Sequence, residues 1–366
     1  MNELDEKTER LGSFAHASGL AGVLLASQPG FAWLTGGGSN RVDGSRENGN
    51  GALFVRADGR RFVIANRIEM PRLLAEELPD ATWEPIDYAW VDDQSRSDTL
   101  ACLAAGVAPG GLPVGADLAI PGTTLLDRPL ARLRAGLVEA EVERYRALGT
   151  DAGRVLGDLC RGLMPGSTEA SVARSVSDAA MSIGGRAVVV LVAGDERIAM
   201  FRHPVPTSRE WRDRLLVAAC IQRAGLVVAL SRIVCVGPPS GDLTTRTQAT
   251  AQVFRALLDA TRPGITGGQL FDVARRSYVE VGFAGEEARH HQGGAIGYRS
   301  REWLAHPASE EQPQPPQAFA WNPSISGTKV EDTALLTRDG IQLITTSPGW
   351  PLLEGVAPGV LRLGGD

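Results

Sequence analysis

The sequence predicts a two-domain α+β protein, with a smaller N-terminal α/β domain over residues 1–135 and a larger domain over residues 136–366. Three observations predict this class. A chain of 366 residues is long enough to form two hydrophobic cores. Its first third places one helical pattern before several short apolar runs of strand length. The remainder combines long helical patterns with a β-hairpin rich in Val, Leu and Ile.

The N-terminal domain begins with a helical pattern from Glu3 to about Ala17. A strand at Gly22–Ala26 follows, and a second short strand is expected to end at Leu34. The glycine-rich segment 35–51 predicts an irregular loop, because glycine removes the steric limits that favour regular structure. Two further apolar runs continue the predicted sheet, at Ala52–Val55 and Phe62–Ala65.

The larger domain opens with a helical pattern from about Leu137 to Leu163. The segment Pro165–Glu169 ends it and starts another helix, which Ser167 or Thr168 can cap. A strand at Ala187–Val192 precedes the hairpin. After the hairpin the sequence predicts two helices and three strands, at about 244–261, 267–281, 318–322, 334–337 and 341–344.

The hairpin spans Leu215–Gly237, where two β-prone runs flank the turn Gln222–Gly225. A turn centred on Arg223 and Ala224 makes Ala218 and Ala229 a directly opposed cross-strand pair. A methyl side chain cannot coordinate a cation. This part of the hairpin therefore offers no metal ligand of its own.

Bulk composition excludes several classes of function. A net charge of −6 argues against a general binder of nucleic acid or anionic membranes. No run of about 18 apolar residues predicts a membrane span, and the charged N-terminus does not resemble a signal peptide. Cys102, Cys160, Cys220 and Cys235 show no CxxC spacing, which favours free thiols and a cytoplasmic location.

Four motifs carry a resemblance to a known superfamily. They are Arg202-His203-Pro204, the hairpin with Ser231-Arg232, the run His290–Gly297 followed by Arg301-Glu302, and Trp321-Asn322-Pro323 with Gly327–Thr333. Together they resemble the pita-bread superfamily of creatinase, aminopeptidase P and prolidase. The resemblance implies a pita-bread C-terminal domain and a smaller creatinase-type N-terminal α/β domain.

The same resemblance addresses the metal question. It places the five ligand positions of the metallopeptidase members at Ala218, Ala229, Gly294, Asn322 and Glu331. Only Glu331 keeps a ligating side chain, and one carboxylate cannot hold two divalent cations. The resemblance therefore implies a member that lacks the metal ligands and needs no cofactor. A site rebuilt from His290 and His291 remains an alternative.

The resemblance also implies a pocket in which histidine replaces the metal. A histidine titrates near neutral pH and is the natural base when no cation activates water, while arginine can hold a substrate carboxylate. The predicted catalytic residues are His203, Glu331, Glu302 and His290. The predicted substrate-binding residues are Arg202, Arg232, Arg299, Arg301, Tyr298, Asn322 and His291.

The function that these residues favour is a metal-independent, creatinase-like hydrolysis of a C–N bond in a small, polar, carboxylate-bearing substrate. An elimination, cyclisation or isomerisation in the same pocket is one alternative. A non-catalytic pita-bread binding protein is another, and an Xaa-Pro metallopeptidase is the least favoured. By the same resemblance we expect a homodimer that binds a small molecule.

Overall fold

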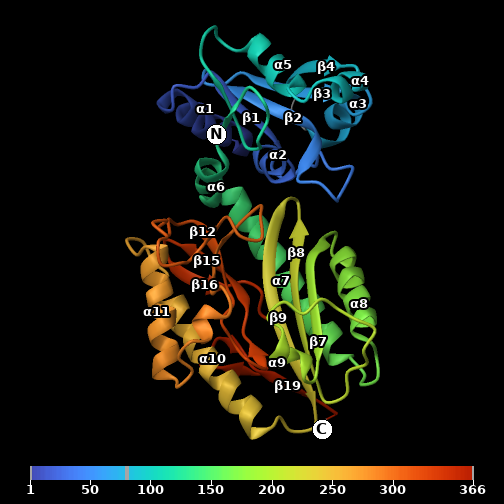
Figure 1. The fold of residues 1–366 in the computed structure, drawn as a ribbon, viewed down its shortest axis with the longest axis vertical. Helices are drawn as coiled ribbons and strands as arrows, with labels where there is room; N and C mark the ends of the chain where they lie inside the picture. The colour runs from blue at the N-terminus through green and yellow to red at the C-terminus, as the bar shows by residue number, and fades with distance from the viewer. Residues whose placement is uncertain (1, 79–81, 365–366) are drawn as a thin grey trace. The chain divides into compact units, whose positions relative to one another are not determined.

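The computed structural model describes residues 2–78 and 82–364. The chain divides into two compact units, Met1–Arg134 and Ala135–Asp366, which are treated separately below (Figure 1). No helix within the described ranges is long and apolar enough to cross a membrane.

The first unit is built on one six-stranded sheet with the strand order β4-β3-β2-β1-β5-β6. The β1, β2 and β3 strands pair antiparallel, whereas β4, β5 and β6 join in parallel. The predicted first helix, first strand and paired apolar strands are confirmed. The elements are α1 (Glu3–Ala17), β1 (Gly22–Ser27), α2 (Gln28–Leu34), β2 (Asn48–Arg56), β3 (Arg61–Asn66), α3 (Met70–Arg72), the π-helix η1 (Leu73–Glu77), β4 (Glu84–Tyr88), α4 (Trp90–Ser95), α5 (Thr99–Val107), β5 (Val114–Ala116), β6 (Thr124–Leu125) and α6 (Asp127–Ala135).

The expected strand ending at Leu34 is wrong, because residues 28–34 form helix α2. Ser27 caps this helix by accepting a hydrogen bond from the Gly30 amide, and Pro29 occupies its first turn. The apolar residues of the segment are buried on the helix rather than in the sheet. The glycine-rich segment is irregular only as far as Asn48, where β2 begins.

The second unit contains two main sheets, with the orders β11-β10-β12-β15-β16 and β19-β9-β8-β7. Figure 1 shows α8 beside β7, with α10 and α11 together at the other side of the unit. The elements are α7 (Glu139–Arg161), α8 (Glu169–Ser182), β7 (Arg186–Gly194), α9 (Arg197–Met200), β8 (Arg214–Arg223), β9 (Leu226–Val236), α10 (Gly241–Ala260), α11 (Gly267–Glu280), the 3₁₀ helix η2 (Glu286–Ala288), β10 (Gly293–Ile296), β11 (Trp303–Leu304), β12 (Gln317–Trp321), β13 (Ser324–Ile325), β14 (Thr328–Lys329), β15 (Asp332–Thr337), β16 (Gly340–Leu343), β17 (Leu352–Leu353), β18 (Ala357–Pro358) and β19 (Val360–Leu363).

The hairpin of β8 and β9 exists, but its register differs from the predicted one. Arg223 pairs with Leu226, so the two-residue turn is Ala224-Gly225. Both turn residues have positive φ angles, 48° and 77°, as the turn favoured by twisted hairpins requires. Ala218 therefore pairs with Ser231, and Ala229 pairs with Cys220. The predicted direct opposition of the two alanines is wrong, although both lie on one face of the hairpin, since side chains repeat their direction every second residue.

Hydrogen bonds join the two sheets of this unit where β9 meets β15. The Ser231 amide donates to the Glu331 carbonyl at 3.0 Å. The Thr333 hydroxyl accepts from the Ala229 amide at 2.8 Å and donates to the Ala229 carbonyl at 2.9 Å. The junction therefore fixes the segment around Glu331 against the hairpin.

The helices complete the packing of this unit. Thr168, one of the two predicted caps, caps α8 by accepting from the Ser171 amide. Helices α10 and α11 contribute Phe254, Leu257 and Leu270 to a buried cluster that also holds Phe319 and Trp321 of β12.

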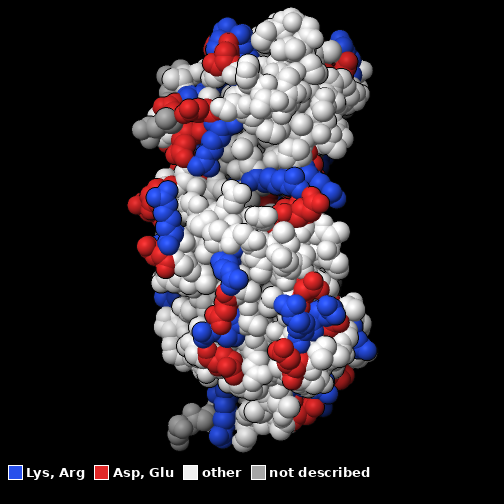
Figure 2. All heavy atoms as spheres, turned by 90° about the vertical axis from the view of Figure 1, so that its left-hand side faces the viewer, with Lys and Arg blue, Asp and Glu red and all other residues white. Residues whose placement is uncertain are grey.

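On the face that Figure 2 shows, acidic and basic side chains lie in small mixed groups. Exposed ion pairs of this kind add little stability.

The corrected register predicts that Ala224→Asn stabilises the protein. Asparagine tolerates the left-handed conformation that costs alanine about 1 kcal/mol, so the free energy of unfolding should rise by up to that amount. Urea unfolding measures the change. Gly225→Ala should act in the opposite direction, and a destabilised Ala224→Asn variant would contradict the observed turn.

Candidate functional site

A cavity of about 360 Å³ lies in the second unit beside the hairpin. Strands β7 and β8 form one wall, and the segments around residues 300 and 322–331 form the other. Its described lining residues are Val189, Leu191, His203, Ala218, Ala219, Cys220, His291, Ser300, Arg301, Asn322, Lys329 and Glu331. The cavity thus brings together five of the predicted site residues: His203, His291, Arg301, Asn322 and Glu331.

Glu331 is buried and forms ion pairs with two cations. Lys329 Nζ lies 2.8 Å from Oε2, and Arg301 Nη2 lies 3.2 Å from Oε1. Burial alone would raise the pKa of the Glu331 carboxyl, but the ammonium and the guanidinium outweigh it and hold this pKa below its usual value. The carboxylate is therefore ionised at neutral pH, and both of its oxygens are bound by protein cations.

The hairpin presents small or weakly ligating side chains to the cavity. Ala218 and Cys220 line it, and the register places Ala229 and Ser231 on the same face. Burial raises the pKa of the Cys220 thiol to about 11, so this residue is not a thiolate. None of the four offers the hard anionic oxygen that a pair of divalent cations requires.

The two remaining ligand positions also fail to fit a two-cation centre. A Cβ atom at Gly294 would lie 2.1 Å from the Trp303 carbonyl oxygen and 2.9 Å from the Leu304 Cα, because β10 pairs closely with β11 there. No side chain fits at this position without a shift of the strands. Asn322 supplies a neutral amide whose Oδ1 atom is buried without a partner among the described residues. The donor set of this chain therefore does not fit the dinuclear centre of the metallopeptidase members of the superfamily.

Three histidines gather at the edge of the cavity. The Nε2 atoms of His203 and His290 are 3.0 Å apart. The ring centroids of His290 and His291 are 4.6 Å apart, and those of His203 and His291 are 5.7 Å apart. A hydrogen bond between two Nε2 atoms requires one donor and one acceptor, so a single hydrogen lies between His203 and His290.

Burial and nearby cations keep these imidazoles neutral. Burial is the largest cause that lowers the pKa of each ring, followed by Lys329 for His203 and His290 and by Arg301 for His291. The pKa of His291 falls to about 4, and that of His290 falls further. The Glu331 carboxylate opposes the shift at His203 and His291 without reversing it.

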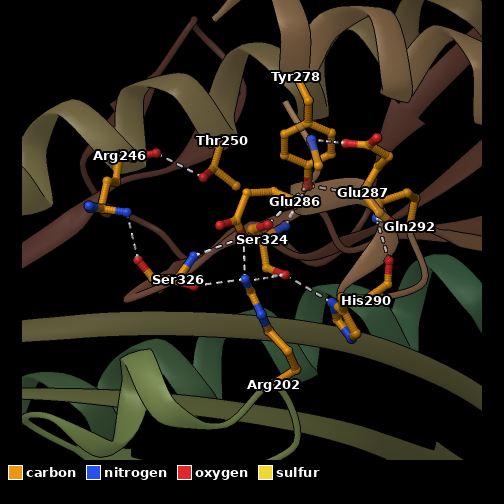
Figure 3. Close-up of polar contacts among 11 residues, drawn as sticks. Arg202, Arg246, Thr250, Tyr278, Glu286, Glu287, His290, Gln292, Ser324 and Ser326 are labelled. Atoms are coloured by element: carbon orange, nitrogen blue, oxygen red, sulfur yellow. Dashed lines mark hydrogen bonds and ion pairs between the residues drawn. The ribbon is translucent and has the colours of Figure 1, made fainter. Parts of the chain in front are cut away.

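A polar network behind the cavity holds His290 in place (Figure 3). Ser324 Oγ lies 3.0 Å from His290 Nδ1 and accepts a hydrogen bond from Arg202 Nη1 at 3.0 Å. Arg202 also pairs with Glu286 and donates to Ser326 Oγ. Its guanidinium is therefore bound within the protein and reaches His290 through Ser324. Arg202 is not among the described lining residues, and its binding of substrate stays a prediction.

The other predicted residues have structural partners outside the cavity. Arg232 is buried, pairs with Asp332 at 3.1 Å and donates to the Thr345 carbonyl at 2.7 Å. The Tyr298 hydroxyl donates to Glu141 at 2.6 Å. Glu302 Oε1 accepts from the amides of Tyr298 and Arg299 at 3.0 and 3.2 Å. None of these four residues, Arg232, Tyr298, Arg299 and Glu302, is among the described lining residues, so their predicted contact with substrate is not supported.

Two residues at the site, Lys329 and Ser324, escaped the sequence prediction. Lys329 lies two positions before Glu331 within the Gly327–Thr333 motif, and this spacing was a usable signal. Ser324 follows the Trp321–Pro323 motif with no pattern that marks it. Its role depends on the spatial approach of β13 to His290, which a single sequence does not reveal.

Comparison with known proteins agrees with this fold. The model of metallopeptidase family M24 matches residues 143–340, more than half of the chain. The probable dipeptidase PepE of Mycobacterium tuberculosis is 26% identical over 355 residues, covering 90% of this chain and 91% of the relative. The PepE dipeptidase structure from Mycobacterium ulcerans has a TM-score of 0.79 at 22% identity, covering 99% and 98% of the two chains. The prolidase structure from Thermococcus sibiricus has a TM-score of 0.80 at 18% identity, covering 99% and 100%.

These comparisons establish the class of the protein. The predicted pita-bread fold is confirmed. The family match and the dipeptidase relatives support a hydrolase of the M24 type. The chain belongs to metallopeptidase family M24.

The closed β10–β11 contact predicts that Gly294→Ala destabilises the protein. The added methyl group would overlap backbone atoms, and overpacking of this kind costs about 1–3 kcal/mol. Chemical denaturation measures the loss. Gly241→Ala is a matched control in the same unit, because a Cβ at Gly241 meets no atom within 4 Å. Equal stability of the two variants would contradict the close contact at Gly294.

The lowered histidine pKa values predict neutral imidazoles in solution. A group whose pKa lies below the ambient pH is deprotonated, so His290 and His291 should both remain neutral at pH 6. Long-range ¹H–¹⁵N correlation spectra report the protonation state of each ring, with assignment by single His→Gln variants. An imidazolium signal from either ring at pH 6 would contradict the lowered pKa values.

Proposed function

We propose that this protein is a metal-independent hydrolase that cleaves a C–N bond in a small, polar, carboxylate-bearing substrate. The observation that carries the proposal is the binding of Glu331, the one remaining ligand-type carboxylate, by Lys329 and Arg301. These cations take the place that divalent ions hold in the metallopeptidases to which the sequence has a resemblance. The hydrolytic class follows from membership of family M24 and from the dipeptidase relatives.

The paired imidazoles of His203 and His290 supply the base. His203 lines the cavity and exchanges a hydrogen bond with His290 at 3.0 Å. A proton taken from water by this pair is shared between the two rings, so the pair acts as one titrating unit. Because Ser324 and Arg202 fix the His290 ring, His203 faces a rigid partner rather than a mobile one.

The charge of the cavity favours an anionic substrate. Arg301 and Lys329 contribute two positive charges and Glu331 one negative charge, which leaves one net positive charge beside three neutral imidazoles. A substrate carboxylate would offset this charge. The apolar side chains of Val189, Leu191 and Cys220 surround the rest of the substrate, and the cavity volume of about 360 Å³ restricts its size.

The reaction that these groups support is general-base hydrolysis. The water oxygen attacks the carbon of the scissile C–N bond while the histidine pair accepts the water proton. Arg301 and the Asn322 amide, both in the cavity wall, stabilise charge that develops on the substrate. The C–N bond then breaks, and the histidine pair returns the proton to the leaving nitrogen.

A second candidate is an Xaa-Pro or other dipeptidase that uses a bound metal ion. The likeness over nearly the whole chain to PepE and to prolidase favours it. It requires ligands other than those at the five expected positions, four of which do not fit. A substrate panel of small guanidino and amide carboxylates on one side, and dipeptides on the other, separates the two candidates.

The decisive variant is His203→Ala, assayed in excess chelator. Turnover of a small carboxylate-bearing C–N substrate should persist in chelator with the wild-type protein. It should fall about 10²–10⁴-fold in the variant, because the general base is removed. His203 is exposed, so its truncation should leave the fold intact, which circular dichroism checks.

His306→Ala is the matched control, since His306 is exposed and lies outside the described cavity lining. Loss of wild-type turnover in chelator, with recovery on addition of metal, would overturn metal independence. Unchanged turnover in His203→Ala would overturn the assignment of the base. A small molecule that binds to the protein without being converted to product would favour the alternative of a non-catalytic binding protein.

A further inference from the structure

We infer that His203, His290 and His291 form a binding site for one transition-metal ion of the zinc, copper or cobalt type. Each residue offers a ring nitrogen, and these three atoms lie within 4.8 Å of one another. None of the three stands at one of the five expected ligand positions. The site is therefore distinct from a dinuclear centre at Glu331.

The geometry needs little adjustment to surround an ion. Zinc binds imidazole nitrogen at about 2.0–2.1 Å, which sets tetrahedral nitrogen pairs roughly 3.4 Å apart. The Nε2 atoms of His203 and His290 are already 3.0 Å apart. The exposed His203 ring and the half-buried His291 ring can rotate into the remaining space. The adjoining cavity leaves a fourth position open to water or another ligand.

The surroundings of His290 are those of an oriented ligand. Ser324 Oγ can accept hydrogen bonds from both His290 Nδ1 and Arg202 Nη1, one at each lone pair. With its hydrogen on Nδ1, His290 has a free lone pair on Nε2 that can bind an ion. An ion that binds both Nε2 atoms displaces the hydrogen between them, which moves to Nδ1 of His203 by a change of tautomer. His291 Nδ1 is buried without a partner among the described residues, which marks a donor or acceptor that the protein leaves unused.

The neighbouring charges determine which ion is preferred and how strongly it binds. Lys329 and Arg301 repel a dication, and Glu331 offsets only one of these charges. The repulsion weakens binding and favours an anion in the fourth position. Three imidazole nitrogens with no carboxylate select zinc, copper, nickel or cobalt over magnesium, calcium or manganese.

A consequence for activity rests on the proposed function. An ion that holds the lone pairs of His203 and His290 removes the base from the reaction, so zinc should inhibit the enzyme. Binding itself does not depend on that function. The two claims therefore need separate measurements, one of bound metal and one of turnover.

Cobalt(II) titration of chelator-treated, tag-free, full-length protein tests the site. Cobalt in a nitrogen-rich, four-coordinate site absorbs visible light, so the titration reports binding without activity. The wild-type protein should bind one equivalent. His291→Ala should weaken binding at least about tenfold. Ser324→Ala, which removes the hydrogen bonds to His290 and Arg202 but no ligand, should weaken it about tenfold. His306→Ala should bind as the wild type does.

Absence of cobalt absorption in the wild type, or equal affinity of His291→Ala and wild type, would overturn the metal site. Circular dichroism of each variant confirms folding, and Ser324→Ala keeps the test valid if His291→Ala does not fold. Turnover with added zinc is then measured in parallel. If the protein binds one ion and zinc increases turnover, the metal site stands and the metal-independent function is overturned. If zinc decreases turnover, both the metal site and the metal-independent function are supported.

Discussion

The ion pairs of Glu331 with Lys329 and Arg301 determine what the rest of the cavity can do. A buried carboxylate is costly unless its charge is compensated, and in this fold two protein cations compensate it. Replacing both cations would leave an unpaired charge in the wall of the cavity, and replacing one would leave one carboxylate oxygen without its cation. Burial, together with one or both of these cations, lowers the pKa of each histidine and keeps it neutral, and the cations give the cavity its positive charge.

The two sheets of the second unit bring these groups together. The junction between β9 and β15 sets the Glu331 segment against the hairpin through Ser231 and Thr333. The β10–β11 pairing closes the space at Gly294, and β13 brings Ser324 to His290. The β9–β15 and β13 contacts are backbone or hydroxyl interactions between segments far apart in the sequence, so the site depends on the fold of the whole unit.

Sequence patterns predicted the helices and the hairpin because the hydrophobic periodicity of these elements is local, whereas the family-level fold was predicted from the four motifs. The sequence predictions failed where local capping or turn residues favoured a different structure. Ser27 and Pro29 start a helix where apolar content suggested a strand, and Ala224 adopts the left-handed conformation that moves the turn by one residue. Within the site, His203, His291, Arg301, Asn322 and Glu331 converge as the motifs implied. Arg232 and Tyr298 do not, because the buried partners Asp332 and Glu141 hold them elsewhere.

Manganese(II) titration followed by electron paramagnetic resonance tests the central claim most directly, since the signal of the hydrated ion disappears when the ion binds. Manganese prefers carboxylate oxygens and binds imidazole weakly, so it reports a centre at Glu331 rather than one at the histidines. The cationic surroundings of Glu331 predict that manganese stays free at concentrations that saturate ordinary two-cation sites. Uptake of one or two equivalents, lost in Glu331→Gln, would contradict the replacement of metal by Lys329 and Arg301.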